Sequence, residues 1–261
     1  MLSNPILMIS GIVFVAVIGY LLKALSFSGA IGTIIVGCFI SLGFKGEGLL
    51  LIGAFFASSS LWSKIKKKQK TSGIIQKGSR RDIIQVFANG AIPASLSLVY
   101  YLYPHEWILV GFITAIAVAN SDTWASEIGP FSKTKPIHIL TLRKVEAGTS
   151  GAVSNLGTIA SFLGSLFIAI IGLLLFEVGY IMAGWITLFG MVGCFLDTIV
   201  GATVQAQYTC KKCGQTTELT EHCKESTVLT KGIRIVNNDL VNVMAIILAT
   251  TVSMLGWKML F

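Results

Sequence analysis

Two carboxylates stand directly after a long apolar run, in the segment Asn120 to Gly129 with the sequence NSDTWASEIG. The preceding run, Trp107 to Ala119, contains no charged residue, so Asp122 and Glu127 are placed where charge is costly and usually functional. Carboxylates, hydroxyls and an amide are hard oxygen ligands, which favour Mg²⁺ and a phosphate-bearing substrate over a soft metal. We therefore expect a magnesium and phosphate site in this segment.

The same segment has helical spacing. If the helix that begins near Trp107 continues through it, polar side chains recur at three- and four-residue intervals and form a seam that faces a bundle interior. The seam comprises Asn120, Asp122, Thr123, Ser126 and Glu127. Asp122 and Glu127 are the expected catalytic metal ligands, and Asn120 and Ser126 are expected to contact substrate or nucleotide.

A third carboxylate, Asp197, lies inside another apolar run, and Gly201 and Gln205 follow it on one helical face. No cation is near Asp197 in the sequence, so protonation, an ion pair or a metal must neutralise it. Magnesium shared with Asp122 or Glu127 would do so, which makes Asp197 a candidate catalytic and metal residue. A protonated acid hydrogen-bonded between helices is the alternative.

The segment Glu146 to Ser154, EAGTSGAVS, is rich in small residues and precedes a span that we expect to begin near Thr158. Its glycines would let backbone amides approach an anion, its hydroxyls could bind phosphate, and the following helix would add its dipole. The candidate phosphate-binding residues are Gly148, Thr149, Ser150 and Gly151. A plain helix start packed with small residues is the alternative. Upstream basic residues could pair with phosphate or remain solvated at the interface. They are Lys133, Lys135, Arg143 and Lys144.

Cys210 and Cys213 form a Cys-x2-Cys pair, and His222 and Cys223 follow nine and ten residues later. These four residues could bind zinc, and a cytosolic location would keep the thiols reduced. A site with four protein ligands leaves no open coordination position, so the zinc would be structural. Unmetallated or redox-active thiols are the alternative.

The segment Asn237 to Asn242, NNDLVN, opens the last apolar run. Its oxygen ligands could bind a second Mg²⁺ through Asp239 or contact nucleotide through Asn238 and Asn242. Alternatively, an Asn or Asp here simply caps the helix.

The composition explains which elements must position these residues. Hydrophobic residues make up 54% of the 261-residue chain and charged residues 12%, which is too apolar for an ordinary soluble protein. We therefore predict an all-α integral membrane protein, a polytopic helix bundle. Spans of about 20 residues consume most of the length, so residues 1–261 form a single membrane domain that contains a Cys/His loop at 206–239.

Apolar runs predict about eight transmembrane helices. Three are short and could be broken or re-entrant, so seven or nine spans are the alternatives. The first run lacks the basic start and the cleavage site of a signal peptide, so we count it as a span. The expected spans are 5–22, 29–42, 49–61, 83–103, 107–120, 158–176, 179–205 and 240–259.

The basic residues predict the orientation. The linker 62–81 contains eight Lys or Arg residues and no acid, and alternating spans place it beside 121–157 and 206–239. Of the 20 basic residues, only Lys45 and Lys258 then face the other side. We therefore expect a multi-pass protein of the cell membrane whose three polar segments face the cytoplasm. The basic run lacks interleaved aromatics, so nucleic acid is not an expected partner. Anchoring against the headgroups of anionic membrane lipids explains residues 64–81 better than a direct role in catalysis does.

The order of these motifs resembles a widespread group of membrane proteins that includes the plant phytyl-phosphate kinase of vitamin E synthesis and the animal transmembrane protein nineteen. The motifs are NSDTWASEIG, GTSGAVS, DTIVGATVQA, CxxC with HC, and NNDLVN, and the similarity covers about Ile83 to Asn242. The group is distantly similar to CTP-dependent dolichol and phytol kinases. The chain shows no transit peptide, so a plastid location is not expected.

The resemblance implies phosphoryl transfer from a nucleoside triphosphate, CTP or ATP, to an isoprenoid monophosphate, with Mg²⁺ as cofactor. Two alternatives use similar residues: a lipid-phosphate cytidylyltransferase, which would release pyrophosphate, and a transporter or flippase, which would turn over no nucleotide. The length of the prenyl chain and the oligomeric state stay open.

Overall fold

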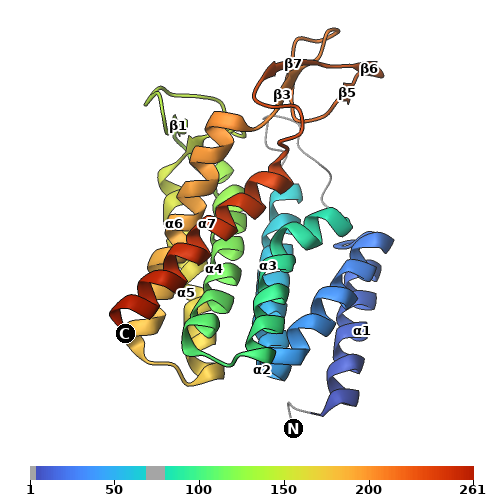
Figure 1. Ribbon diagram of the computed structural model, residues 1–261. Helices are drawn as coiled ribbons and strands as arrows, with labels where there is room; N and C mark the ends of the chain where they lie inside the picture. The colour runs from blue at the N-terminus through green and yellow to red at the C-terminus, as the bar shows by residue number, and fades with distance from the viewer. Residues whose placement is uncertain (1–3, 69–79) are drawn as a thin grey trace.

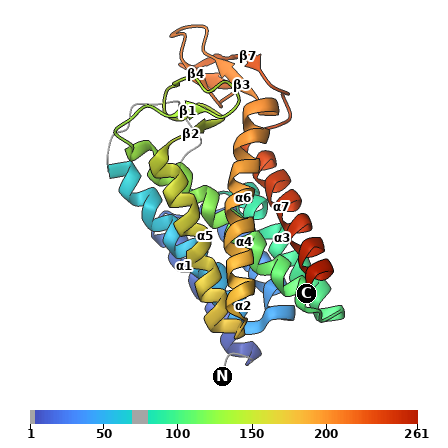
Figure 2. The same ribbon diagram turned by 90° about the vertical axis from the view of Figure 1, so that its left-hand side faces the viewer.

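The computed structural model describes residues 4–68 and 80–261. Its α-helices stand side by side in a bundle, with loops that contain short strands at one end (Figures 1 and 2). The helices are α1 (Pro5–Leu21), α2 (Phe27–Lys68), α3 (Ile83–Leu102), α4 (Glu106–Ile128), α5 (Asn155–Phe176), α6 (Tyr180–Val204) and α7 (Asn238–Leu260). Six of them, α2 to α7, are long and apolar enough to cross a membrane, and α1 is shorter at 17 residues.

Helix α2 is bent back on itself at Lys45, whose backbone leaves the helical region with φ 47° and ψ −140°. The two expected spans 29–42 and 49–61 are therefore the two arms of one long helix. The side chain of Phe56 in the second arm lies beside Gly19 and Arg81, and Arg81 pairs with Leu25, just before the first arm begins. The arms thus run in opposite directions, so α1, the two arms and α3 to α7 agree with a prediction of about eight transmembrane segments.

The chain runs alternately up and down, which separates polar from apolar connections. Segments 129–154 and 205–237 lie at one end of the bundle with the end of α2 and the start of α3, and we call this the polar end (Figures 1 and 2). The start of α1 and the end of α7 lie at the other end. Among the described basic residues, Lys45 is at the bend of α2 and Lys258 lies over Trp107 at the start of α4, which places both away from the polar end.

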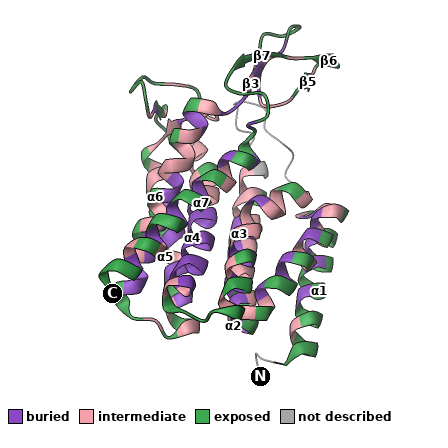
Figure 3. Ribbon diagram, in the orientation of Figure 1, coloured by how far each residue is buried: buried purple, intermediate pink, exposed green. Residues whose placement is uncertain are grey.

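Helix α4 forms the core of the bundle. Residues 108 and 110–121 of α4 are buried, and it packs against α2, α3, α5, α6 and α7 (Figure 3). Small residues bring the neighbouring helices close: a Cβ on Gly190 would lie 2.0 Å from Ser165 Oγ, and one on Gly193 would lie 2.4 Å from Val118. Close backbone approach and interhelical hydrogen bonds drive helix association in lipid, so these contacts hold α4, α5 and α6 together.

Capping side chains start the helices at the polar end. Asp82 and Gln85 form a capping box at α3, Ser154 accepts from Gly157 N–H at α5, and Asn237 accepts from Leu240 N–H at α7. Helix α5 therefore begins three residues before Thr158, the expected start. Helix α4 continues through the NSDTWASEIG segment to Ile128, as the helical spacing of its polar residues predicts.

Short antiparallel strands shape the two polar loops. Strands β1 and β2 pair in the first loop, and the second contains a three-stranded sheet of order β4-β3-β7 and the pair β5-β6. The strands are β1 (Ile137–His138), β2 (Ala152–Val153), β3 (Gln207–Thr209), β4 (Thr216–Thr217), β5 (Glu221–His222), β6 (Glu225–Ser226) and β7 (Val228–Lys231), and a 3-10 turn (Gly129–Phe131) follows α4. Pairing within the loops fixes segments that are polar and irregular in sequence.

Candidate active site

A cavity of about 990 Å³ opens at the polar end, where the ends of the helices meet the two loops. Residues of α2 to α7 and of both loops line it. Most of the residues expected to form the site are among them: Asp122, Ser126, Glu127, Gly148, Thr149, Ser150, Gly151, Asp197, Asn238, Asp239 and Asn242. Motifs that are more than 100 residues apart in the chain therefore share one cavity.

Helix α4 supplies Asp122 and Glu127. The buried run of α4 ends at Ser121, so the next turn presents Asp122 to the cavity at the edge of the apolar core. Glu127 accepts a hydrogen bond from Ser63 Oγ at 2.8 Å, and its Oε2 lies 3.3 Å from Lys66 Nζ. Glu127 thus has a cation partner from α2, whereas Asp122 has none among the described lysines and arginines.

Helices α6 and α7 supply the other acids. The Asn242 side-chain nitrogen lies 2.9 Å from Asp197 Oδ2 in the amide orientation that satisfies its neighbours. Asp197 and Asp122 line the same cavity, where the two carboxylates repel each other as like charges. Asp239, in the first turn of α7, is buried and lines the same cavity. Asn237 is the N-cap of α7, so one of the Asn residues of this segment does cap the helix.

The small-residue turn lies against α6. Gly148 and Gly151 both have φ of 87°, a left-handed conformation that side chains disfavour. A Cβ on Gly151 would also lie 2.5 Å from Ala202 Cβ, so only glycine lets the turn approach α6 this closely. Thr149 Oγ1 donates to the Glu146 carbonyl at 2.8 Å, which stabilises the turn itself.

A chain of hydrogen bonds links this turn to the second loop. Ser150 Oγ donates to Gln205 Oε1 at 3.0 Å, and Gln205 Nε2 donates to Glu218 Oε1 at 2.9 Å. Burial raises the pKa of Glu218, while the Gln205 hydrogen bond opposes that shift. Glu218 was not expected in the site, because nothing in its neighbouring sequence marks it as a ligand.

Asn120 lies outside the cavity, in contrast to the expectation that it contacts substrate. Its side chain is fully buried, where Oδ1 accepts from Ser58 Oγ at 3.0 Å and Nδ2 donates to the Gly164 carbonyl at 2.7 Å. Asn120 therefore joins α2, α4 and α5 below the cavity floor. Its polar groups are satisfied by the protein, which accounts for an amide at this depth.

Three polar residues at the start of α3 also line the cavity: Arg81, Gln85 and Asn89. Gln85 and Asn89 stand one helical turn apart on one face of α3, and Arg81 lies two residues before the helix begins. Arg81 donates to Ser60 Oγ at 3.3 Å and lies 5.4 Å from the ring centroid of Phe56. Arg81 thus brings a cation to the wall of the cavity.

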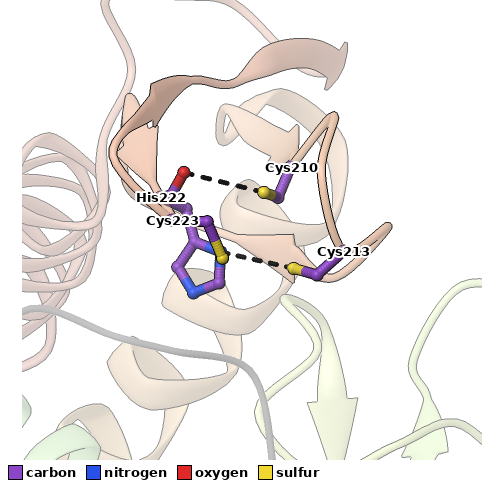
Figure 4. Close-up of side chains that lie close together, drawn as sticks. All are labelled: Cys210, Cys213, His222 and Cys223. Atoms are coloured by element: carbon purple, nitrogen blue, oxygen red, sulfur yellow. Dashed lines mark hydrogen bonds between the residues drawn. The ribbon is translucent and has the colours of Figure 1, made fainter.

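The Cys/His residues form a compact cluster in the second loop (Figure 4). One ligand atom from each of Cys210, Cys213, His222 and Cys223 lies within 4.8 Å of the others. His222 Nδ1 is 3.4 Å from Cys213 Sγ and 3.3 Å from Cys223 Sγ. Hydrogen bonds from the Cys213 backbone and the His222 side chain lower the pKa of Cys210 to about 6. The four atoms have the number and closeness of a tetrahedral zinc site, whose ligands lie about 2.0–2.3 Å from the ion.

Similar proteins place the chain in a family. An uncharacterized membrane protein of Methanocaldococcus jannaschii is 37% identical over 182 residues, which cover 69% of this chain and 74% of that protein. Protein VTE6, chloroplastic, of Arabidopsis thaliana is 29% identical over 252 residues, covering 94% of this chain and 68% of that protein. Protein PGR of the same plant is 29% identical over 223 residues, which cover 73% of this chain and 75% of that protein. No solved structure matches the chain.

The family match extends over nearly the whole bundle. Residues 10–250 match the family described as Integral membrane protein DUF92. Together with the plant relatives, this match confirms the resemblance that the ordered motifs indicate. The chain belongs to the DUF92 family of integral membrane proteins.

Proposed function

We propose that this protein is a membrane-embedded kinase that transfers a phosphoryl group from a nucleoside triphosphate, CTP or ATP, to an isoprenoid monophosphate. The observation that supports this proposal most strongly is the cavity at the polar end. Carboxylates from three helices line it together with Lys66, Arg81 and Arg234, and its volume is near the top of the ~300–1,000 Å³ range of ligand sites. A cavity of that size can hold two phosphate-bearing substrates side by side.

The donor set fits magnesium. Asp122 and Asp197 repel each other as like charges, and neither pairs with a lysine or arginine among residues 4–66 and 80–261. A cation would neutralise two such carboxylates at the edge of an apolar core, and hard oxygen ligands favour Mg²⁺. Asp122 and Asp197 would hold the ion, with Asp239 and Glu127 next to them. Bound there, Mg²⁺ would neutralise phosphate charge during transfer.

The chain's own residues address the repulsion between two anionic substrates. A phosphate monoester has its second pKa near ~6 and is mostly dianionic at neutral pH, so it needs little help from a general base. Lys66 and Arg81 can bind phosphate oxygens, and the turn with Gly148 and Gly151 can present backbone N–H groups. An oxygen of the acceptor phosphate then attacks the γ-phosphorus, the bond to the bridging oxygen breaks, and a nucleoside diphosphate leaves.

The location of the cavity favours an enzyme over a transporter. It opens at the polar end of the bundle, whereas a transporter usually binds its substrate near the middle of the membrane. An acceptor with an apolar tail can stay in the membrane while its phosphate reaches the cavity. We also propose that the polar end faces the cytoplasm, because the described basic residues other than Lys45 and Lys258 lie away from the opposite end.

We further propose structural zinc at the Cys210, Cys213, His222 and Cys223 cluster. The number and proximity of the ligand atoms support it. The same loop brings Glu218 to Gln205 and so contributes a wall of the cavity. Zinc would therefore affect activity indirectly, by fixing the loop.

The proposed function is tested with purified protein, MgCl₂, CTP or ATP, and a panel of prenyl monophosphates. A kinase yields the prenyl diphosphate and a nucleoside diphosphate, which mass spectrometry identifies. A cytidylyltransferase yields a CDP-linked lipid and pyrophosphate, and a transporter yields neither product. Either of the last two results would replace the proposal.

A further inference from the structure

A second cavity, of about 460 Å³, lies between α1, both arms of α2 and α3. Its wall is almost entirely apolar and includes Leu7, Ile12, Val36, Leu49 and Phe55. We call it the apolar groove. Ligand pockets have volumes of ~300–1,000 Å³, so the groove has room for one hydrocarbon chain of moderate length.

Two glycines keep the groove open. A Cβ added to Gly11 on α1 or to Gly53 on α2 would meet nothing within 4 Å, although both residues line the groove. Gly37 serves a different purpose, because its Cβ would lie 2.9 Å from Ile12 and the glycine lets α1 pack against α2. The groove is thus an open space between α1 and α2, which pack closely against each other at Gly37 and Ile12.

The apolar groove and the polar cavity meet at three residues. Arg81, Gln85 and Asn89 line both spaces. The Arg81 guanidinium carbon lies 5.4 Å from the ring centroid of Phe56 and 6.0 Å from that of Phe55, both of which line the groove. A cation therefore stands where the apolar wall ends and the carboxylate-lined cavity begins.

This junction matches a molecule with one apolar tail and one anionic head. A tail in the groove would extend into the membrane between α1 and α2, and the head would emerge beside Arg81 toward Asp122 and Glu127. An arginine held near two aromatic rings is suited to bind phosphate at this boundary, because guanidinium combines stacking with paired N–H donors.

We infer that the apolar groove binds the isoprenoid tail of the acceptor and that Arg81 binds its phosphate. This inference rests on the proposed function for the identity of the acceptor. It adds the binding surface for the tail, in helices that contribute few groups to the phosphoryl-transfer cavity. The other occupant of such a groove, an ordinary membrane lipid, is an outcome of the test below.

The test uses a geranylgeranyl monophosphate analogue with a photoreactive diazirine at the far end of its tail, bound to purified protein without nucleotide. Crosslinks mapped by mass spectrometry are expected on α1 and α2, and excess geranylgeranyl monophosphate should suppress them. Gly53→Leu should lower labelling about tenfold, the effect of withdrawing roughly two methylene groups from an apolar site. Gly11→Leu is a second variant on the opposite wall.

The matched control is Gly184→Leu, since Gly184 is another helical glycine with nothing within 4 Å of its Cβ and lines neither space. Labelling of this variant should equal that of the wild type. Crosslinks on α4 to α7, or labelling that geranylgeranyl monophosphate does not suppress, would overturn the inference. If the groove is labelled but the protein transfers no phosphoryl group, tail binding in the groove would be supported and the proposed kinase activity contradicted. If Gly53→Leu and Gly11→Leu both transfer the phosphoryl group at the wild-type rate, the kinase would be supported and the role of the groove contradicted.

Discussion

The side-chain nitrogen of Asn242 on α7 lies 2.9 Å from a carboxylate oxygen of Asp197 on α6, and it also lies 3.0 Å from the Asn238 carbonyl. The last helix thereby fixes the orientation of a carboxylate on the helix before it. Because Asp197 also interacts with Asp122 on α4, this hydrogen bond affects how carboxylates from two helices face each other.

Asn242→Ala should lower kcat/KM by about tenfold to a hundredfold while leaving the protein folded. A hydrogen bond to a charged group contributes roughly 1.5–3 kcal/mol, and the loss would leave Asp197 free to rotate. Thr203→Ala is the control, because Thr203 is exposed on α6 and donates only to carbonyls of its own helix. Steady-state kinetics of the two variants make the comparison. Equal rates in both would show that the orientation of Asp197 is irrelevant to turnover.

Asp122→Asn should remove most activity. The loss of one ligand charge from a magnesium site costs several kcal/mol of transition-state stabilisation, which corresponds to roughly a thousandfold or more in rate. Glu106→Gln, an exposed acid at the opposite end of the same helix, should retain full activity. Initial rates and thermal midpoints should be measured for both. Asp122 would be excluded from the site by a folded Asp122→Asn protein with near-wild-type turnover.

Cys213→Ser should lose bound zinc and lower the thermal midpoint, because a structural ligand contributes its binding energy to the fold. Any loss of activity should follow the loss of folded protein, unlike the loss in Asp122→Asn. Cys38→Ser changes an exposed cysteine on α2 and should alter neither zinc content nor stability. Elemental analysis of wild-type protein with no zinc, and full activity in a zinc-selective chelator, would contradict the zinc site.

Glu218→Gln should stabilise the protein near neutral pH. Burial raises the pKa of Glu218, so the folded protein holds this proton more tightly than the unfolded chain, and stability falls as pH rises above the ordinary glutamate pKa. Glutamine cannot ionise but still offers Gln205 an acceptor. The difference between the thermal midpoints of variant and wild type should therefore be positive at neutral pH and shrink under acid.

Glu146→Gln controls this comparison, because Glu146 is exposed and its pairing with Lys135 is at the surface. The midpoint difference for that variant should stay near zero across the same pH range. A Glu218→Gln midpoint below that of wild type at neutral pH would show that the ionised carboxylate stabilises the loop.

The orientation is tested with two single cysteines. Thr134 lies exposed in the first polar loop, and Gly179 lies between α5 and α6 at the opposite end, with free space around its Cβ. An impermeant thiol reagent applied to intact cells should label Gly179→Cys above the wild-type background and should reach Thr134→Cys only after permeabilisation. The reverse labelling pattern would show that the polar end faces the outside of the cell.

Much of the bundle could be predicted from the apolar runs, because a membrane requires long apolar helices and their positions follow from composition alone. The runs 29–42 and 49–61 predict separate spans, and the chain does reverse between them at Lys45. The polar loops could not be predicted in the same way, because tertiary contacts decide their structure. Strands of two to four residues in the loops have no periodicity that a sequence could reveal.

The carboxylates of the site could be identified because a charge inside an apolar run is rare and costly. Asp122, Asp197 and Asp239 all line one cavity. Asn120 could not be distinguished from them by spacing, since its burial depends on Ser58 and Gly164 in other helices. Glu218 went unnoticed because it stands in no motif, and Arg81 was noticed only as one charge of the basic linker 62–81. Each reaches the site only through the fold.

In the proposed reaction, the terminal phosphoryl group of a nucleoside triphosphate moves to a prenyl monophosphate in this cavity. The most direct measurement supplies purified protein with geranylgeranyl monophosphate and CTP or ATP that is radiolabelled at either the α- or the γ-phosphorus, and then separates the lipid products. We predict that the lipid gains label from the γ-position, none from the α-position, and none at all with Asp122→Asn. Label from the α-position of CTP, or an unlabelled lipid with every nucleotide and prenyl phosphate supplied, would contradict the account.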